Sequence, residues 1–465
     1  MLKRILFLWA SSMLFFCCSP VVVDRKSDKS DDIQIEKFDV PQNKKEIRKQ
    51  STIQEFPETF FYPVDKKIIR VGLLESKRIN FKIDQGYRVL GTILKSGAYI
   101  SDIYNGKLRI LSGKRVLVSG EELVLEPEFK NSSFIIPSKK QGKGWHWEQK
   151  GNIPYNGEII ISKKGSTCLV VNKLDIEDYL KGVVPSEMPS KAGLEPLKAQ
   201  AVLARTNAYH SIVEQNGKYD IFSDVYDQVF LGNLKRSDVS DLAVDLTKNE
   251  ILTYEEQPIY VYFHAVSGGR TEKSSNVWNN VDLPYITPVW TTKTVPSLDL
   301  SNENDFKFYI ENNFTSFFNL EKYNVDEGLS YLFKYYRWEL RSSKKSIEAR
   351  MSKKYKNIGK FKSIDILKRT SSGKVISIKI NGDKGSYKVD GELSIRRILS
   401  DPPLYSSNFY YDVKGDDILF LGSGHGHGAG LCQSSAIGMA IEGRSYKEIV
   451  SLFYPGTKFS KVISK

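Results

Sequence analysis

The sequence predicts an α+β protein in which antiparallel strands predominate. Two observations favour strands: short apolar runs alternate with turn residues over residues 68–171, and the pattern returns over residues 375–421. A third observation favours helices between these regions, because apolar residues recur every three or four positions from Leu197 to Ile212. Strands that are grouped apart from helices, rather than alternating with them, are typical of the α+β class.

The first strand-rich region is predicted to consist mostly of hairpins. Its apolar runs are short, and turn residues at 154–157 and 163–166 flank a strand at Glu158 to Ile161. Turns of this length connect neighbouring antiparallel strands.

Two helices are predicted after the hairpins. Asp175 opens a short helix over Ile176 to Lys181, and Asp178 follows three residues later in the manner of a capping box. A longer helix begins near Pro196, a residue that the first helical turn tolerates, and ends before residues 216–217. Its apolar stripe is rich in alanine, so we expect it to pack very close to its neighbour.

The remaining elements are less regular. Residues 297–360 form a polar, helix-leaning stretch, which we interpret as an insertion that is either a surface for the wall or a partner, or a solvated pair of helices. A closing helix is expected at Tyr446 to Phe453.

Composition places the chain among soluble folded proteins. Of its 465 residues 40% are apolar and 26% charged, which excludes collagen-like, coiled-coil and wholly disordered classes. Lys and Arg total 68 against 55 Asp and Glu, a net charge of +13 that favours anionic polymers in general. No arginine-rich run or zinc-ligand spacing points to nucleic acid, so we expect no nucleic-acid partner.

The N-terminus has the features of an export signal. A basic start and an apolar stretch over residues 1–18 end in Cys17-Cys18, which resembles a bacterial lipoprotein signal with Cys18 as the lipidated residue. The alternatives are an ordinary cleaved signal or an uncleaved anchor. Residues 19–60 are charged and poor in apolar residues, so we expect a flexible tether that lets an envelope protein reach away from the membrane to which its lipid anchors it.

Glu187 is the leading catalytic candidate. Pro185 and Pro189 bracket it at equal distance, so we expect a short, restricted loop that holds the carboxylate between two helices. The alternative from the residues alone is that Glu187 caps the following helix.

Three blocks of sequence resemble one known family. They occur in order, at residues 177–206, 224–278 and 424–457, and the first reads Glu-Asp-Tyr-Leu-Lys-Gly-Val-Val-Pro-Ser-Glu-Met before Leu-Lys-Ala-Gln-Ala-Val-Leu-Ala-Arg-Thr. They are similar to the stage II sporulation protein D (SpoIID) and LytB amidase-enhancer family. The resemblance implies a SpoIID-like domain over residues 61–465, with a motif core at 165–290, the insertion at about 297–360 and a Gly/His motif at 421–457.

The resemblance implies a peptidoglycan lytic transglycosylase. Such an enzyme cleaves the bond between N-acetylmuramic acid and N-acetylglucosamine and leaves 1,6-anhydro ends, without a cofactor or metal. Glu187 matches the family's catalytic acid. The acid protonates the leaving oxygen, and the C6 hydroxyl of the muramic sugar then attacks, so a second carboxylate is not required.

Other motif positions are expected to bind the glycan in a groove lined by the helices around Glu187. These positions are Arg205, Gln228, His264, Ser267, Gly268, Gly269, Thr271, His427 and Gln433. For Arg205 the alternative is an ion pair with Glu177 or Asp178. For His264 and its neighbours the alternative is a glycine turn beside a hydrogen-bonded histidine.

Two further hypotheses remain open. As the family name suggests, the chain could be a non-catalytic wall-binding module that activates an N-acetylmuramoyl-L-alanine amidase. His425 and His427 could instead contribute to a zinc hydrolase, although Cys168 and Cys432 complete no familiar ligand spacing.

Overall fold

The computed structural model describes residues 60–64, 67–141, 149–214, 217–223, 227–278, 281–355 and 358–464. All of them belong to one compact unit, Thr59–Lys465. The expected signal segment with Cys18, and the expected tether up to residue 59, lie outside the described residues. Within the described part, no helix is both long and apolar enough to cross a membrane.

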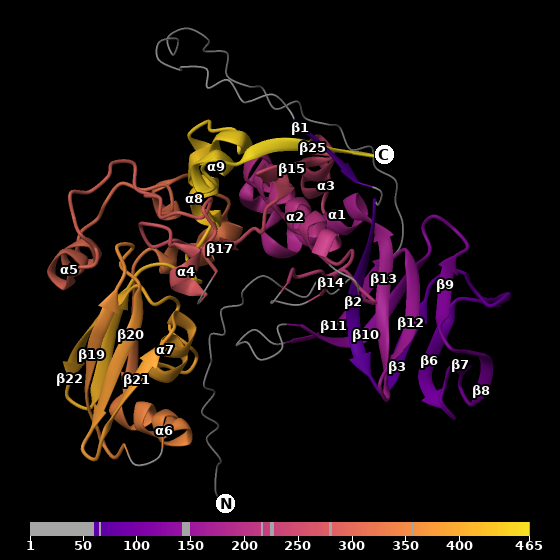
Figure 1. Ribbon diagram of the computed structural model, residues 1–465, viewed down its shortest axis with the longest axis horizontal. Helices are drawn as coiled ribbons and strands as arrows, with labels where there is room; N and C mark the ends of the chain where they lie inside the picture. Colours follow the sequence, from indigo (N-terminus) through magenta and orange to yellow (C-terminus); the bar gives the residue numbers. More distant parts are fainter. Residues whose placement is uncertain are drawn as a thin grey trace, which may run out of the picture. The chain divides into compact units, whose positions relative to one another are not determined.

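The expected hairpins form two sheets at the start of the unit (Figure 1). The first has seven strands in the order β14 (Ile221–Phe222), β2 (Ile68–Ser76), β13 (Thr167–Asp175), β12 (Glu158–Lys164), β9 (Leu123–Pro127), β4 (Tyr87–Val89) and β5 (Thr92–Leu94). The second has six, in the order β11 (Gln149–Asn156), β10 (Ser133–Gln141), β3 (Arg78–Ile83), β6 (Gly97–Tyr104), β7 (Lys107–Ser112) and β8 (Arg115–Gly120). Apart from the parallel β14–β2 pair, the neighbours in these sheets run antiparallel.

A helical layer follows the sheets. It consists of α1 (Ile176–Glu187), η1 (Ser190–Ala192), α2 (Leu194–Glu214), α3 (Asp238–Leu246), α8 (Gln433–Ile441) and α9 (Tyr446–Phe453). The alanine-rich α2 packs against α1, α3, α8 and α9, as its small side chains predict. Helices from both halves of the sequence therefore meet on α2.

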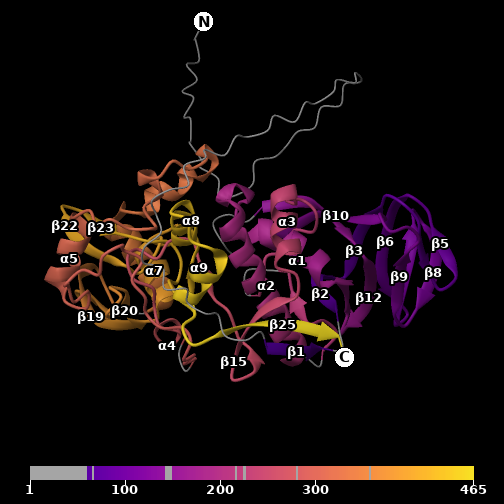
Figure 2. The ribbon, with the colours of Figure 1, turned by 90° about the horizontal axis from the view of Figure 1, so that it is seen from above.

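A four-stranded sheet joins the two ends of the unit. Its order is β1 (Phe60–Val64), β25 (Lys458–Ser464), β15 (Glu250–Tyr254) and β16 (Gln257–Pro258). Figure 2 shows β25 beside β1 and β15; β25 pairs with β1 in parallel. Strand β15 packs against α2, so this sheet supports the helical layer.

Helix α1 is longer than the sequence predicted. The expected end at Lys181 is wrong, because the helix continues through the buried Pro185 and ends at Glu187. Gly182 lies where a Cβ atom would be 2.5 Å from the carbonyl oxygen of Gly232, so the helix packs directly on the backbone there. This tertiary contact explains why a sequence of Gly, Val and Pro, which weakens isolated helices, stays helical.

Residues 338–422 form a separate β-rich module, here called the C-terminal module. Its strands are β18 (Trp338–Ser343), β22 (Phe409–Lys414), β23 (Asp417–Gly422), β19 (Phe361–Arg369), β20 (Val375–Gly382) and β21 (Ser386–Asp390), and its helices are α6 (Lys344–Lys354) and α7 (Glu392–Leu399). Trp338, Ile378, Leu399 and Phe420 belong to one buried cluster, so both small sheets and both helices share a core.

The interpretation of residues 297–360 as a pair of helices is wrong. Helix α5 (Glu303–Glu311) packs with Tyr410 in one apolar cluster, whereas α6 packs against β18, β19 and α7 in the core of the C-terminal module. Two short 3-10 segments, η2 (Leu320–Lys322) and η3 (Glu327–Tyr335), lie between them. The stretch is therefore divided between two packing units.

Candidate active site

Glu187 is the last residue of α1 and is partly exposed. Its Oε1 accepts a hydrogen bond of 2.7 Å from the backbone N–H of Val229. The expected restricted loop is thus replaced by a helix end. The carboxylate is still held firmly, because the backbone of a second segment fixes it.

The segment around Val229, which bonds to Glu187, packs closely on α1 at Gly182. A Cβ atom on Gly182 would lie 2.5 Å from Phe230 as well as from the Gly232 carbonyl. The Phe230 ring also packs at 4.9 Å from that of Tyr179, one helical turn before Gly182. Gly182 therefore brings the backbone at Val229 within hydrogen-bonding distance of Glu187.

Gln228 is buried beside this segment and is hydrogen-bonded to two helices. It is 1% exposed, and its Oε1 accepts a hydrogen bond of 3.1 Å from the Tyr179 hydroxyl. Its Nε2 donates to the carbonyl of Ala204 on α2 at 3.4 Å. The expected glycan contact is not seen at this position; Gln228 instead positions its neighbour Val229.

The electrostatic environment of Glu187 favours its neutral form. Burial raises the pKa of Glu187 to about 7, because surrounding protein replaces the water that would solvate the charge. The Val229 N–H and the positive charge of Lys235 lower the pKa without offsetting this effect. A carboxyl group with such a pKa can donate a proton near neutral pH and accept one later in the same cycle.

Gln433 connects the C-terminal motif to Glu187. Its Nε2 donates to the Glu187 carbonyl at 2.9 Å and to Oε1 of Gln200 at 3.2 Å. Gln433 begins α8, directly after β24 (Leu431–Cys432), which pairs in parallel with β17 (Phe263–His264). All three motif blocks therefore meet at Glu187, and partly exposed Gln433 remains a candidate for substrate contact.

A row of partly exposed rings begins next to β17. Tyr262 stacks on Trp278 with ring centroids 3.8 Å apart and an interplanar angle of 16°. Trp278 follows the short helix α4 (Ser274–Val277), and its ring lies 4.9 Å from that of His427. Such rings suit the apolar faces of sugars. The sequence offered one signal for them, the position of Trp278 within the second motif block.

His427 contributes its ring to this row as a neutral group. Its Nδ1 accepts a hydrogen bond of 3.1 Å from the N–H of Ala429, so the proton of the neutral ring is on Nε2. Burial lowers the pKa of His427 to about 4. We therefore expect it to contact a ligand through its ring rather than through charge.

The other two motif histidines face different surroundings. His264 is buried, and its Nδ1 donates to the Ala429 carbonyl at 3.1 Å. His425 lies against Tyr335, with ring centroids 4.4 Å apart, on a different set of aromatic residues from His427. In the described ranges no three His, Cys, Asp or Glu side chains come together in a way that could hold a metal ion.

The Ser267 to Thr271 segment is buried in the protein rather than open to a ligand. The Ser267 hydroxyl pairs with that of Thr291 at 2.7 Å, and the Thr271 hydroxyl accepts from the N–H of Val289 at 2.8 Å. A Cβ atom on Gly268 would lie 2.6 Å from Asn408, and one on Gly269 would lie 2.1 Å from the Tyr309 hydroxyl. These glycines allow close packing of protein on protein, which is the glycine-turn alternative.

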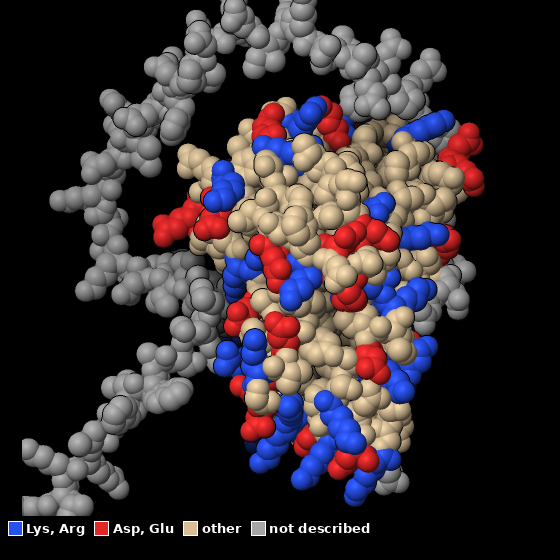
Figure 3. Space-filling model, turned by 90° about the vertical axis from the view of Figure 1, so that its left-hand side faces the viewer, with Lys and Arg blue, Asp and Glu red and all other residues tan. Residues whose placement is uncertain are grey.

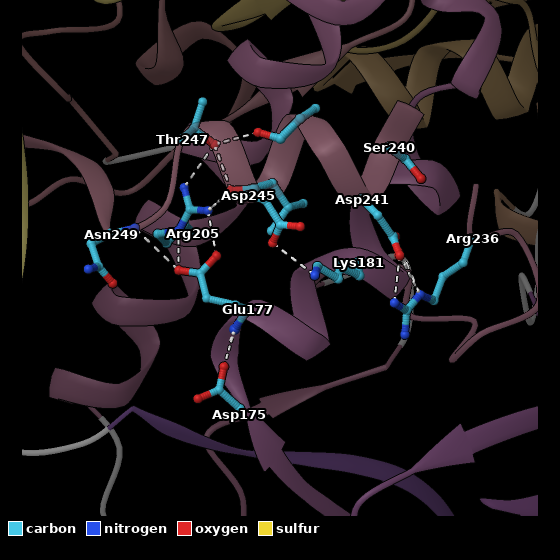
Figure 4. Close-up of polar contacts among 12 residues, drawn as sticks. Asp175, Glu177, Lys181, Arg205, Arg236, Ser240, Asp241, Asp245, Thr247 and Asn249 are labelled. Atoms are coloured by element: carbon cyan, nitrogen blue, oxygen red, sulfur yellow. Dashed lines mark hydrogen bonds and ion pairs between the residues drawn. The ribbon is translucent and has the colours of Figure 1, made fainter. Parts of the chain in front are cut away.

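Arg205 is a structural cation (Figure 4). Its guanidinium is 0% exposed and donates to both carboxylate oxygens of Glu177, at 2.9 and 2.7 Å. It also donates to the carbonyls of Val244 and Glu250, each at 3.1 Å. The expected glycan contact is not available from this position, and the structure has the alternative, an ion pair with Glu177.

Two family models match the chain. The one described as "Stage II sporulation protein" (SpoIID) matches residues 164–254, which include Glu187 and Gln228. The other, described as "Domain of unknown function (DUF8618)", matches residues 272–430 and so includes the C-terminal module.

Curated relatives match a larger part. An uncharacterized protein of Brachyspira hyodysenteriae is 32% identical over 310 residues, which cover 65% of this chain and 72% of that protein. Stage II sporulation protein D of Bacillus subtilis is 27% identical over 63% of this chain and 76% of its own length. The amidase enhancer of Bacillus subtilis is 30% identical over 60% of this chain and 40% of its own length.

Proposed function

Because this chain belongs to the SpoIID/LytB family, we propose that it is a peptidoglycan lytic transglycosylase that cleaves between N-acetylmuramic acid and N-acetylglucosamine. The observation that carries the proposal is Glu187, a partly exposed carboxyl group with a pKa of about 7 at the meeting point of the three motif blocks. This group can begin the reaction as an acid and finish it as a base.

In the proposed reaction the neutral Glu187 gives its proton to the glycosidic oxygen, and the bond from that oxygen to C1 of the muramic sugar breaks. The C6 hydroxyl oxygen of the same sugar then bonds to C1, and its proton passes to the Glu187 carboxylate. The acid is regenerated and no water is consumed. The muramic sugar supplies its own nucleophile, so one carboxyl group is sufficient.

Gln433, which contacts Glu187, and the ring row next to β17 suit the substrate. The partly exposed amide of Gln433 can bind a sugar hydroxyl or acetamide, and the rings of Tyr262, Trp278 and His427 offer an apolar face for a sugar. Two buried residues stabilise the site. Gln228 positions its neighbour Val229, which donates to Glu187, and Arg205 pairs with Glu177 at the start of the same helix.

The test is mass spectrometry of the soluble products after purified protein is incubated with intact and with peptide-stripped peptidoglycan. We expect 1,6-anhydro-muramyl ends from at least one substrate, and their loss in Glu187→Gln. Glu122→Gln, which neutralises an exposed glutamate on the N-terminal sheets, is the matched control and should leave the products unchanged. Reducing muramyl ends would instead indicate hydrolysis and contradict the proposal.

A second candidate function is activation of an amidase, and the similarity to an amidase enhancer favours it. Under this hypothesis the chain binds the cell wall, and an N-acetylmuramoyl-L-alanine amidase releases the stem peptides from the glycan. Adding the protein to an amidase with intact peptidoglycan distinguishes the two. Faster peptide release that is equal for the unmodified protein and Glu187→Gln, with no anhydro ends, would support the activator.

We also propose that the chain is exported to the cell envelope and lipid-anchored through Cys18. The supporting pattern is the apolar stretch that ends in Cys17-Cys18. Cells fed a labelled fatty acid should label the protein, and Cys18→Ala should abolish the label whereas Cys17→Ala should not. Label that persists in Cys18→Ala would contradict the assignment.

A further inference from the structure

The positive charge of this protein is concentrated in one tenth of the chain. Residues 344–390 contain twelve Lys and two Arg against four Asp and Glu, a net charge of +10 out of +13 for the whole sequence. The segment runs from α6 through β19 and β20 to β21, all within the C-terminal module. The catalytic role proposed for Glu187 does not use this charge.

The lysines, rather than the arginines, carry the available charge. Arg369 is buried in an ion pair with Glu303 at 2.7 Å, and Arg350 donates to the carbonyls of Ile398 and Leu399. The exposed lysines, here called the lysine patch, are Lys345, Lys353, Lys354, Lys360, Lys362, Lys368, Lys384 and Lys388. Of these eight lysines, Lys388 forms an ion pair with Asp390, at 3.1 Å. Figure 3 shows Lys and Arg side chains gathered at the lower end of the face that it presents.

Two members of the lysine patch, Lys360 and Lys384, line a pocket of about 340 Å³. Its lining includes the ring of Tyr355 and the charged side chains of Glu348, Lys360, Asp383 and Lys384. The Tyr355 ring stacks on that of Tyr387, with centroids 4.6 Å apart and an angle of 22°, which fixes its orientation. The Nζ of Lys354 lies 5.4 Å from the centroid of the Tyr355 ring. An aromatic ring and two lysine side chains thus line one concave site, and a third lysine, Lys354, lies against the same ring.

Two carboxylates in the pocket are engaged by the backbone. Glu348 accepts a hydrogen bond from the N–H of Phe361, and Asp383 accepts one from the N–H of Lys360, each at 2.8 Å. They keep free lone pairs that can accept hydroxyl protons. The net charge around them stays strongly positive. The pocket thus offers acceptors for hydroxyl groups and cations for anionic groups.

We propose that the lysine patch and its pocket bind an anionic polysaccharide of the cell wall, one that carries phosphate or carboxylate groups, at a site separate from Glu187. The aromatic ring and the carboxylates match a sugar unit, and the lysines match anionic groups spaced along a flexible chain. Lysines make single, adaptable contacts, which suits a polymer better than a fixed bidentate ligand. The pocket favours a polysaccharide over a lipid surface, because a membrane needs a charged face but no concave site.

The test measures binding of the full chain carrying Glu187→Gln, so that the result does not depend on cleavage. The probes are phosphate-substituted dextran, a polyuronate and neutral dextran at ~50 mM salt, where charge screening is weaker than at physiological salt. We expect at least one anionic polymer to bind and neutral dextran not to bind. Replacing Lys354, Lys360 and Lys384 by Gln should weaken the affinity about tenfold, because three positive charges that can contact the polymer are lost.

The control removes equal charge elsewhere. Lys77, Lys95 and Lys114 are exposed on the N-terminal sheets, and their replacement by Gln should leave the affinity within about twofold of the parent. Tyr355→Leu keeps apolar area but removes the ring, and should weaken polymer binding without changing the net charge. An equal loss of affinity in the two triple-lysine variants would overturn the proposal. Binding to vesicles that contain phosphatidylglycerol, without binding to either anionic polymer, would also overturn it.

Discussion

The two ends of helix α1 carry the same side chain in opposite electrostatic settings. Glu177, in the first turn, accepts two hydrogen bonds from Arg205 at the end where the helix dipole favours negative charge. Glu187, the last helical residue, lies at the end where the dipole disfavours it, beside the Val229 N–H. Position within the fold, rather than residue type, therefore makes one glutamate the partner of a buried arginine and raises the pKa of the other to about 7.

The largest expected effect comes from Glu187→Gln. Loss of the acid should reduce formation of anhydro ends by about 10²- to 10⁴-fold, the range for removing a general acid. Its stability in urea should stay close to that of the unmodified protein, because the amide keeps the Val229 contact. Both are measured on one preparation, and a large loss of stability would mean that Glu187 is structural like Glu177.

Glu177→Gln should show the reverse pattern. The change leaves Arg205 buried beside a neutral partner, and we expect a loss of about 2–4 kcal/mol in the free energy of unfolding. The lower part of the usual range applies because the Glu177 side chain is 15% exposed. Urea denaturation measures the loss. Asp178→Asn, at the exposed neighbouring position, is the control and should change stability by less than about 0.5 kcal/mol.

Gly182→Ala should reduce both the stability of the protein and the reaction rate. The new Cβ atom would lie 2.5 Å from Phe230 and from the Gly232 carbonyl, so one of the two segments must move. We expect a stability loss of about 1–3 kcal/mol and a lower rate, since Val229 would leave Glu187. Unchanged activity in a destabilised protein would show that the Val229 contact is dispensable for catalysis.

The pH dependence sharpens the assignment of the acid. With a pKa of about 7 for Glu187, the initial rate should fall about tenfold per pH unit above that value as the acid loses its proton. Because burial raises the folded-state pKa, the stability contribution is fully present below the ordinary value of 4.5 and is lost as pH rises to about 7. Glu187→Gln should lack this dependence, whereas Glu177→Gln should retain it.

The smallest expected effect concerns the ring row. Trp278→Leu removes the ring that stacks on Tyr262 and lies 4.9 Å from that of His427, and should raise KM by about two- to tenfold with kcat nearly unchanged. Initial rates at several glycan concentrations separate the two parameters. A fall in kcat alone would place Trp278 in support of Glu187 rather than in substrate binding.

Local sequence patterns predicted the α+β class, the antiparallel hairpins and the alanine-rich helix, and the structure confirms them. These features depend on residues that are close in sequence, because the spacing of apolar residues and the positions of turn residues determine local secondary structure. The sequence also determined the family, through blocks of residues that the SpoIID model and the curated relatives match. The catalytic role of Glu187 stays a prediction.

Which motif residues are accessible to a ligand depends on contacts between segments that are distant in sequence. Arg205 meets a partner 28 positions away, and the Val229 N–H reaches Glu187 across 42 positions. The end of α1 likewise depends on a backbone contact at Gly232, and the lysine patch forms because α6 packs against β19. Sequence patterns show which side chains exist, but burial and charge pairing are set by segments that meet only when the chain folds.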